Sequence, residues 1–595
     1  MRSLGKILVG LLASIGFIVV VLIGLGIYAA ARWEGTHEAH RAPDRFVLTL
    51  DLDKGFDESP DGTKLASLKF GPHVTFQDAV LALKRAKDDP RVIGVAASLN
   101  DQAIGIARIQ EIRDLIGQIR AAGKPTTLFS ESIGEGTGAM SSYYLASAFG
   151  DIWVQPSGDV GIAGIGIEQP FFKKLLDRIG VKASFVKRKE YKSAAENLTD
   201  ESMSPANHEE LQALLGGWFD QMVTGIAGDR KLTPAAVKDL VDKGPLTAAE
   251  AKDGGLIDHL GYRDEFEANL GKTTGGMVHV PLSKYAQMEP PEGRPEPKKS
   301  IAVITAVGEI SRGTADDSPL SSDNGIKSAV VAKAIRDAVG NQNVAAIIIR
   351  IDSPGGSYVA SDTIWREVVR AKQSKKPVIV SMGDVAASGG YFIAMAADRI
   401  FAEPGTITGS IGVLSGKIVI GGASDKLDVH WDRITAGESA GLYSSTTDFT
   451  PKQLARLNEV MDTVYTDFTT KAAQGRKVDV ETLEKSAHGR VWSGADALKV
   501  GLVDELGGFA QALDYTKTQI GLKPSDTVWL LSYPPAEDPW EKLLKTLSDG
   551  DVPSDIFTMM RSAAEIGRVL APAEGILAGT STHGPQLQMA PVIVN

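Results

Sequence analysis

Two halves of the 595-residue sequence resemble each other in register. The segment DGGLIDHLG at 253–261 matches KVGLVDELG at 499–507, at an offset of 246 residues. The segment 150–167 matches 397–414 at an offset of 247, and 89–99 also resembles 341–351. Chance does not hold one register over so long a stretch. The sequence therefore predicts a tandem duplication of a unit of about 220 residues, and not the four domains that length alone suggests.

The boundaries of the two units follow from a segment rich in proline and charge. Residues 289–299 (EPPEGRPEPKK) contain nothing to bury and are typical of an interdomain linker. The linker separates a first repeat at 45–288 from a second repeat at 300–522. Residues 523–595 remain as a C-terminal extension of unknown role.

The N-terminus contains a long apolar run. No charged residue occurs from Ile7 to Ala31, after Arg2 and Lys6. A helix of this length, at about 1.5 Å per residue, crosses a hydrocarbon core of about 30 Å. We therefore expect residues 1–31 to form a single transmembrane anchor, with a weak preference for a cytoplasmic N-terminus. A cleaved signal peptide is the main alternative and a buried soluble helix a remote one.

Composition excludes several kinds of function. The chain has 63 Lys and Arg against 74 Asp and Glu, a net charge of −11, which argues against nucleic acid as a partner. It has no cysteine, which excludes disulfides, thiolate metal sites and cysteine nucleophiles. We expect no metal and no cofactor.

Each unit alternates short β-rich runs with amphipathic helices. In the second half, the runs at 301–310, 344–352, 376–383 and 398–405 are typical of strands buried on both faces. This alternation predicts an α/β fold with a largely parallel sheet.

A glycine pair follows one of these predicted strands in the second half only. Gly355 and Gly356 stand between a strand and a helix, where backbone N–H groups can point at a negatively charged group. The corresponding loop of the first half, residues 100–107, has no such pair. A tight turn without function is the simpler alternative for the glycines taken alone.

A serine stands at the next strand-to-helix turn. Ser388 is followed by two glycines, so its Oγ can be presented while the next amide serves an oxyanion. Short Ser-Gly turns are also common without any function. The repeat partner, Ser141, is followed by Ser142 and Tyr143 in place of glycines. The two halves therefore differ in their chemistry.

A nucleophilic serine needs a base. None of the nine histidines stands in a recognisable triad motif, which leaves lysine as the other known activator, provided that burial lowers its pKa. Lys192 is followed by the small residues SAA, and its counterpart in the second half is Glu438. A solvated charged face is the simpler explanation of the cluster around Lys192.

Together these motifs resemble one family. Tyr-Lys-Ser-Ala in the first repeat, with Ser-Pro-Gly-Gly-Ser, Ala-Ala-Ser-Gly-Gly-Tyr and Thr-Gly-Ser-Ile-Gly in the second, is similar to the long-form members of the S49 (protease IV) family of bacterial membrane-anchored serine proteases. The resemblance covers residues 1–522. It implies two crotonase/ClpP-like domains and a Ser/Lys dyad divided between them.

The resemblance assigns a role to each residue of the site. Ser388 would be the nucleophile and Lys192 the general base, while Ser410 would orient the lysine amine. The backbone N–H groups of Gly355 and Gly389 would form the oxyanion hole, with Gly356 as the neighbouring substitute for Gly355.

The family further implies a substrate, an assembly and a location. The substrates would be extended apolar peptides, above all the remnant signal peptides left in the membrane. The protein would be a homo-oligomer, expected to be a tetramer, in the bacterial inner membrane with its catalytic part on the periplasmic side. Two alternatives are an acyl-CoA hydratase or isomerase of the crotonase fold, and a membrane scaffold without activity.

Overall fold

The computed structural model describes residues 43–58, 74–102, 104–135, 139–275, 278–291, 296–314 and 325–535, and the backbone of 586–588. The expected membrane anchor at 1–31 lies outside these ranges. Inside them, none of the helices combines the length and the apolar character that a membrane span requires.

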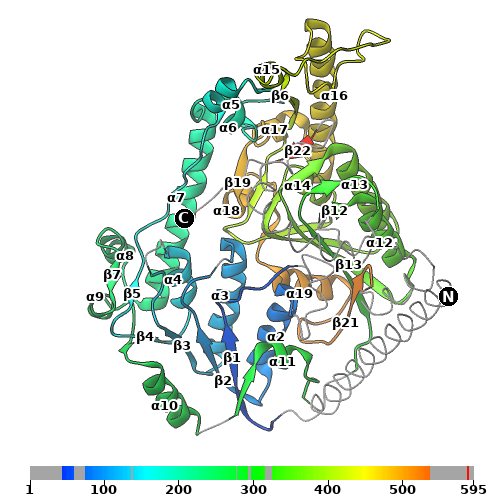
Figure 1. Ribbon diagram of the computed structural model, residues 1–595. Helices are drawn as coiled ribbons and strands as arrows, with labels where there is room; N and C mark the ends of the chain where they lie inside the picture. Colours follow the sequence, from blue (N-terminus) through cyan, green and yellow to red (C-terminus); the bar gives the residue numbers. More distant parts are fainter. Residues whose placement is uncertain are drawn as a thin grey trace, which may run out of the picture.

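The first repeat is built on a parallel sheet of six strands (Figure 1). Every neighbouring pair in this sheet is parallel, as the alternation of strands and helices predicts. The strand order is β8 (His259–Leu260), β4 (Asp151–Val154), β3 (Thr126–Ser130), β2 (Val92–Ser98), β1 (Phe46–Asp51) and β9 (Val278–Pro281).

Ten described helices and a small two-stranded sheet complete the first repeat. The small sheet pairs β5 (Asp159–Val160) with β7 (Leu246–Thr247). The helices are α2 (Phe76–Asp88), α3 (Ile106–Ala121), α4 (Met140–Ala146), α5 (Lys173–Ile179), α6 (Glu196–Thr199), α7 (Pro205–Arg230), α8 (Pro234–Val241), α9 (Ala248–Asp253), α10 (Arg263–Thr274) and α11 (Leu282–Gln287).

The second repeat carries the equivalent sheet. Its order is β19 (Val491–Ser493), β17 (Ile407–Gly409), β15 (Val378–Ala387), β13 (Val344–Ser353), β10 (Ser300–Val307) and β21 (Trp529–Tyr533), with β16 (Arg399–Ala402) also paired to β15 and β20 (Glu505–Leu506) paired to β16. All pairs are parallel except that of β17 with β19. The sheet extends beyond residue 522, because β21 pairs with β10.

The apolar runs form strands because both of their faces are covered. In β13 the consecutive residues Ile347, Ile348 and Ile349 are all fully buried, with alternate side chains on opposite faces of the sheet. The helices of the second repeat that pack against this sheet are α12 (Ser328–Gly340), α13 (Tyr358–Gln373), α14 (Gly389–Ala394), α18 (Gly494–Lys499) and α19 (Phe509–Gln519). Three further helices, α15 (Gly421–Lys426), α16 (Pro451–Arg476) and α17 (Val480–Glu484), lie beyond it.

A third sheet joins the two repeats. It contains β12 (Ile326–Lys327), β11 (Ile310–Ser311), β14 (Gly355–Ser357), β22 (Gln586–Gln588) and β18 (Val413–Val419), and it ends on β6 (Lys182–Arg188) of the first repeat. β18 and β6 pair in antiparallel register over seven residues each, from Val413 opposite Arg188 to Val419 opposite Lys182. This pairing fixes one repeat against the other.

A buried ion cluster also lies between the repeats. The guanidinium of Arg350 on β13 lies 2.5 Å from a carboxylate oxygen of Glu58 and 2.7 Å from one of Glu111 on α3. All three side chains are at least 98% buried. An unpaired charge at such a position would cost several kcal/mol, so the cluster favours one arrangement of the two repeats.

Candidate active site

Ser388 lies at the junction of β15 and α14, where the sequence predicts a strand-to-helix turn. Its backbone has φ +55° and ψ −111°, a conformation that L-residues rarely adopt. The surrounding structure holds it there: the Ser388 N–H donates to the Gly409 carbonyl at 2.8 Å, and the Ser388 carbonyl accepts from the Phe392 N–H at 2.8 Å. Such a turn directs the side chain out of the strand and into the space before the helix.

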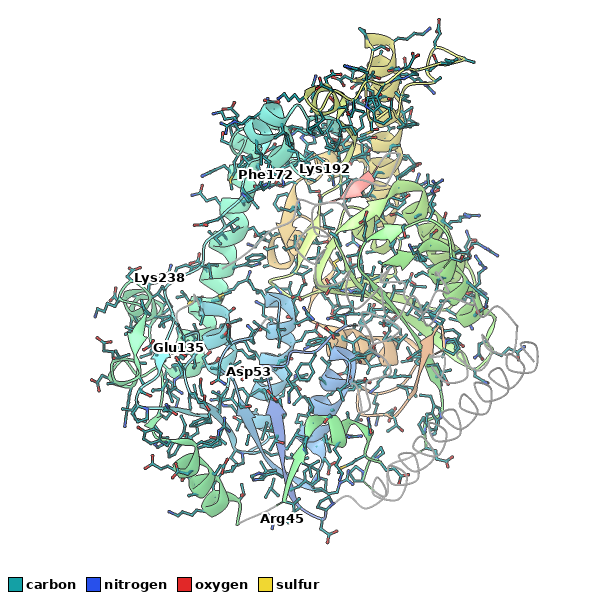
Figure 2. All side chains as sticks on the ribbon, in the orientation of Figure 1. Arg45, Asp53, Glu135, Phe172, Lys192 and Lys238 are labelled. Atoms are coloured by element: carbon teal, nitrogen blue, oxygen red, sulfur yellow. The ribbon has the colours of Figure 1, made fainter. Side chains whose placement is uncertain are left out.

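The antiparallel pair β6–β18 brings Lys192 to this serine. Lys192 follows the end of β6 by four residues, and Ser410 precedes β18 by three. Because Arg188 pairs with Val413, the chain after β6 runs back past the segment before β18. Figure 2 shows Lys192 in the upper half of the molecule, where the first repeat meets the second.

The amine of Lys192 contacts both serines that the sequence analysis selected. Its Nζ lies 2.8 Å from Ser388 Oγ and 3.0 Å from Ser410 Oγ, and it also donates to the Ser410 carbonyl at 3.1 Å. The whole lysine is 1% exposed. Ser388, Lys192 and Ser410 therefore meet, although 196 residues separate the first two in sequence.

Burial changes the protonation of this lysine. Desolvation lowers the pKa of Lys192 to about 7, and the nearby carboxyl of Glu210 opposes the shift. At pH 7 an ordinary lysine is neutral in about one molecule in 10³ to 10⁴, whereas a lysine with a pKa near 7 is neutral in about half. This amine can therefore accept a proton at neutral pH.

Glu210, on α7, is a member of the site that the sequence analysis missed. It is 2% exposed, and its carboxylate accepts from Ser193 Oγ at 3.0 Å and from the Val491 N–H of β19 at 3.0 Å. Burial raises the pKa of Glu210 to about 7. One carboxyl group thus links the residue after Lys192 to a strand of the second repeat, and β19 in turn pairs with the strand that precedes Ser410.

The glycines of the two loops lie beside Ser388. A Cβ on Gly389 would be 2.7 Å from Ser361 Oγ, 3.1 Å from the Gly356 nitrogen and 3.2 Å from Gly355 Cα, so the two loops approach more closely than a side chain allows. Gly389 is the first residue of α14, where a backbone N–H has no partner within the helix. The Gly355 N–H donates to Ser353 Oγ at 3.2 Å.

Metal ligands do not gather at this site. In the part of the chain that the structure describes, no group of three or more His, Asp or Glu side chains is arranged to hold a metal ion.

Comparison with known proteins identifies the family. The sequence model of the family described as "Peptidase family S49" matches residues 119–275 and again 370–523, once in each repeat. The chain belongs to peptidase family S49. It is a serine peptidase, and the two alternatives considered above, an acyl-CoA enzyme and an inactive scaffold, are therefore set aside.

Relatives of this S49 peptidase match it over most of its length. Protease 4 of Salmonella typhi is 31% identical over 542 residues, 87% of this chain and 84% of that protein. Protease 4 of Haemophilus influenzae is 31% identical over 81% of this chain and 80% of that protein. The chloroplastic serine protease SPPA of Arabidopsis thaliana is 31% identical over 75% of this chain and 66% of that protein.

A solved structure also matches part of the chain. It is the S97A mutant of the 1510-N membrane-bound stomatin-specific protease, at 19% identity and a TM-score of 0.25, over 40% of this chain and 99% of that one. The S49 assignment rests on the two matched segments and on the full-length relatives.

Proposed function

We propose that the protein is a serine endopeptidase with a Ser388/Lys192 dyad divided between its two repeats. The observation that carries this proposal is the 2.8 Å contact between Lys192 Nζ and Ser388 Oγ, made by an amine with almost no exposure to solvent. Hydrogen-bond contact between a hydroxyl and a base with a pKa near the working pH is the requirement for nucleophilic catalysis by serine.

The reaction is acyl transfer. Neutral Lys192 takes the proton of Ser388 as Oγ attacks the carbonyl carbon of a peptide bond. The resulting ammonium gives the proton to the leaving amine, and an acyl-enzyme ester remains on Ser388. Lys192 then removes a proton from water as the water attacks the ester. The bond between the acyl carbon and Ser388 Oγ breaks, Lys192 returns the proton to Oγ, and the acid product leaves with both residues restored.

Ser410 and Glu210 support the lysine in different ways. Ser410 accepts from the amine through its hydroxyl and its carbonyl, so it holds Nζ toward Ser388. Glu210 holds the neighbouring Ser193 and favours the ammonium form electrostatically, which limits the fall in the pKa of Lys192. Neither group forms a bond to the substrate in this scheme.

Backbone amides stabilise the negative oxygen of the tetrahedral intermediate. Gly389 contributes the N–H at the first position of α14, which has no partner within the helix, and Gly355 contributes the second donor. The Gly355 N–H must exchange its contact with Ser353 Oγ for the oxyanion. Gly356 is the neighbouring alternative donor, since its nitrogen lies nearer to Gly389.

The substrates in this proposal are extended apolar peptides, including remnant signal peptides, and the enzyme is a homo-oligomer, a tetramer. An anchor at residues 1–31 holds it in the bacterial inner membrane with the catalytic part in the periplasm. Support comes from the uncharged run at Ile7–Ala31 and from the resemblance to long-form S49 proteases. An anchored chain is expected to stay in the membrane fraction after alkaline extraction, and its release into the soluble fraction would contradict the anchor.

Replacement of each repeat's serine tests the dyad. Ser388→Ala is expected to lower kcat/KM for a short apolar peptide by at least about 10³-fold, because no nucleophile remains. Ser141→Ala, at the equivalent position of the first repeat, is the matched control and retains the wild-type rate. Retained cleavage in Ser388→Ala, or equal losses in both variants, would reject the assignment.

A further inference from the structure

A strand from near the end of the sequence lies across the proposed active site. β22 pairs in antiparallel register with β14, with Gln588 opposite Gly355, Leu587 opposite Gly356 and Gln586 opposite Ser357. Its other edge meets β18, where Gln586 lies opposite Leu414 (Figure 1). The strand therefore occupies the position between β14 and β18 in the third sheet.

This position adjoins the residues proposed for catalysis. β14 contains Gly355 and Gly356, and β22 also contacts α14, the helix that starts directly after Ser388. β18 is the strand that follows Ser410. A chain segment in this position therefore passes between the loop with the proposed oxyanion donors and the segment that holds the lysine amine.

The two flanking strands accept one extended segment at a time. The other edge of β14 pairs with β11 and the other edge of β18 pairs with β6, so each has one remaining edge, and both of these edges face β22. An extended peptide binds such an edge through backbone hydrogen bonds, which any sequence can make. A substrate peptide and β22 therefore require the same backbone groups.

β22 is not part of the duplicated unit. The match to peptidase family S49 ends at residue 523, and β22 begins at Gln586. The sequence analysis gave no role to the extension that contains it. A segment outside the catalytic units that pairs at the catalytic strand is in the position of a ligand.

We propose that residues 586–588 are an internal ligand of the peptide-binding edge, and that they compete with substrate for it. This inference rests on the proposed function, because it takes β14 and β18 as the strands that bind substrate. A segment tethered to its own site has an effective concentration on the order of 1 mM. If its intrinsic Kd is about 0.1 to 1 mM, the tether raises the apparent KM by about 2- to 10-fold.

Removal of the strand tests this competition. A chain that lacks residues 586–595 is expected to show an apparent KM about 2- to 10-fold lower for a short apolar fluorogenic peptide, with kcat unchanged. The double variant Gln586→Pro/Leu587→Pro in the full chain is expected to lower the apparent KM in the same way, since proline has no N–H to donate to a neighbouring strand. An unchanged KM in both would overturn the proposal.

Two further measurements define the mode of binding. A synthetic peptide with the sequence of residues 581–595 is expected to inhibit the shortened chain competitively, and an absence of inhibition at about 1 mM would count against the proposal. Gln586→Ala/Leu587→Ala keeps both N–H groups and is expected to retain the wild-type KM. A fall equal to that of the proline variant would contradict recognition through the backbone.

The competition can be examined without any catalysis. The shortened chain and the full chain are compared with Ser388→Ala present in both. Backbone amide hydrogen exchange at residues 354–358 is expected to be faster in the shortened chain, because β14 has lost its partner β22. Equal exchange would reject the pairing. If cleavage persists in Ser388→Ala, the proposed function fails. If Ser388→Ala is inactive but the shortened chain has the same KM as the full chain, only the internal ligand is refuted.

Discussion

The two repeats have kept the same scaffold with high fidelity. Arg230 at the end of α7 forms a bidentate pair with Asp258, and Arg476 at the end of α16 forms the same pair with Asp504, at an offset of 246 residues in both partners. Each arginine also donates to a glycine carbonyl nearby. The two helices have 26 residues each and begin with proline after a capping hydroxyl.

The same two repeats differ wherever the proposed chemistry occurs. Ser388 contacts a buried lysine, whereas Ser141 lies within α4 and its Oγ accepts from the Gln102 amide at 3.4 Å. The position equivalent to Lys192 is Glu438, which lies in a loop, is 76% exposed and pairs with Lys452 at the start of α16. Both repeats thus retain the ion pairs that hold their helices and sheet together, whereas the proposed active site takes its residues from both copies.

The largest expected effect follows from removal of the amine. Lys192→Met keeps the length and apolar stem of the side chain but cannot take a proton, so kcat/KM is expected to fall by at least about 10³-fold, or about 4 kcal/mol. Lys189→Met, three residues earlier on an exposed part of the same segment, is the control and keeps its activity. Activity that survives in Lys192→Met would mean that another group serves as base.

A smaller and symmetrical effect is expected from the repeated ion pairs. Arg230→Met and Arg476→Met each leave a partly buried aspartate unpaired, at about 2 kcal/mol after allowance for its exposure. Each is expected to lower the Tm by about 5 °C in calorimetry. Arg456→Met, in an exposed pair with Glu459, should leave the Tm unchanged. Unequal losses would show that the two copies no longer share a scaffold.

The smallest effect concerns pH. In the proposed mechanism neutral Lys192 is the active form, so kcat/KM is expected to rise with pH through about 7 and to level off above it. Glu210→Gln removes a charge that favours the ammonium, so the midpoint is expected to move to lower pH by up to about one unit, or about 1.4 kcal/mol. Glu209→Gln, on the exposed side of the same helix, is the control. A midpoint that stays fixed in Glu210→Gln would remove Glu210 from the site.

Much of the fold could be predicted because its signals are local. The duplication and the α/β alternation follow from register and from strands buried on both faces, as Ile347 to Ile349 illustrate. The family was also predicted, and the match in both repeats confirms it. The meeting of Lys192 and Ser388 was implied only by resemblance, because the β6–β18 pair that produces it joins segments with no sequence signal for each other.

Glu210 was missed for a different physical reason. A glutamate in the second turn of a helix ordinarily faces solvent, and nothing in its neighbours marks it as buried. One sequence comparison could have drawn attention to it, since the 246-residue register places the oppositely charged Arg456 at the equivalent position. In the structure, the side chain of Arg456 is 66% exposed. A position that is buried in one copy and exposed in the other is a position where the copies serve different purposes.

The proposed division of the dyad between the repeats also has a consequence in time. A ribosome makes Lys192 first and Ser388 only 196 residues later, which takes about 10 to 40 s at bacterial rates of synthesis. Until the second repeat has emerged and β18 has paired with β6, the nascent chain contains a base without a nucleophile. In the proposed scheme, the protease stays inert until its second repeat has been made and has paired with the first.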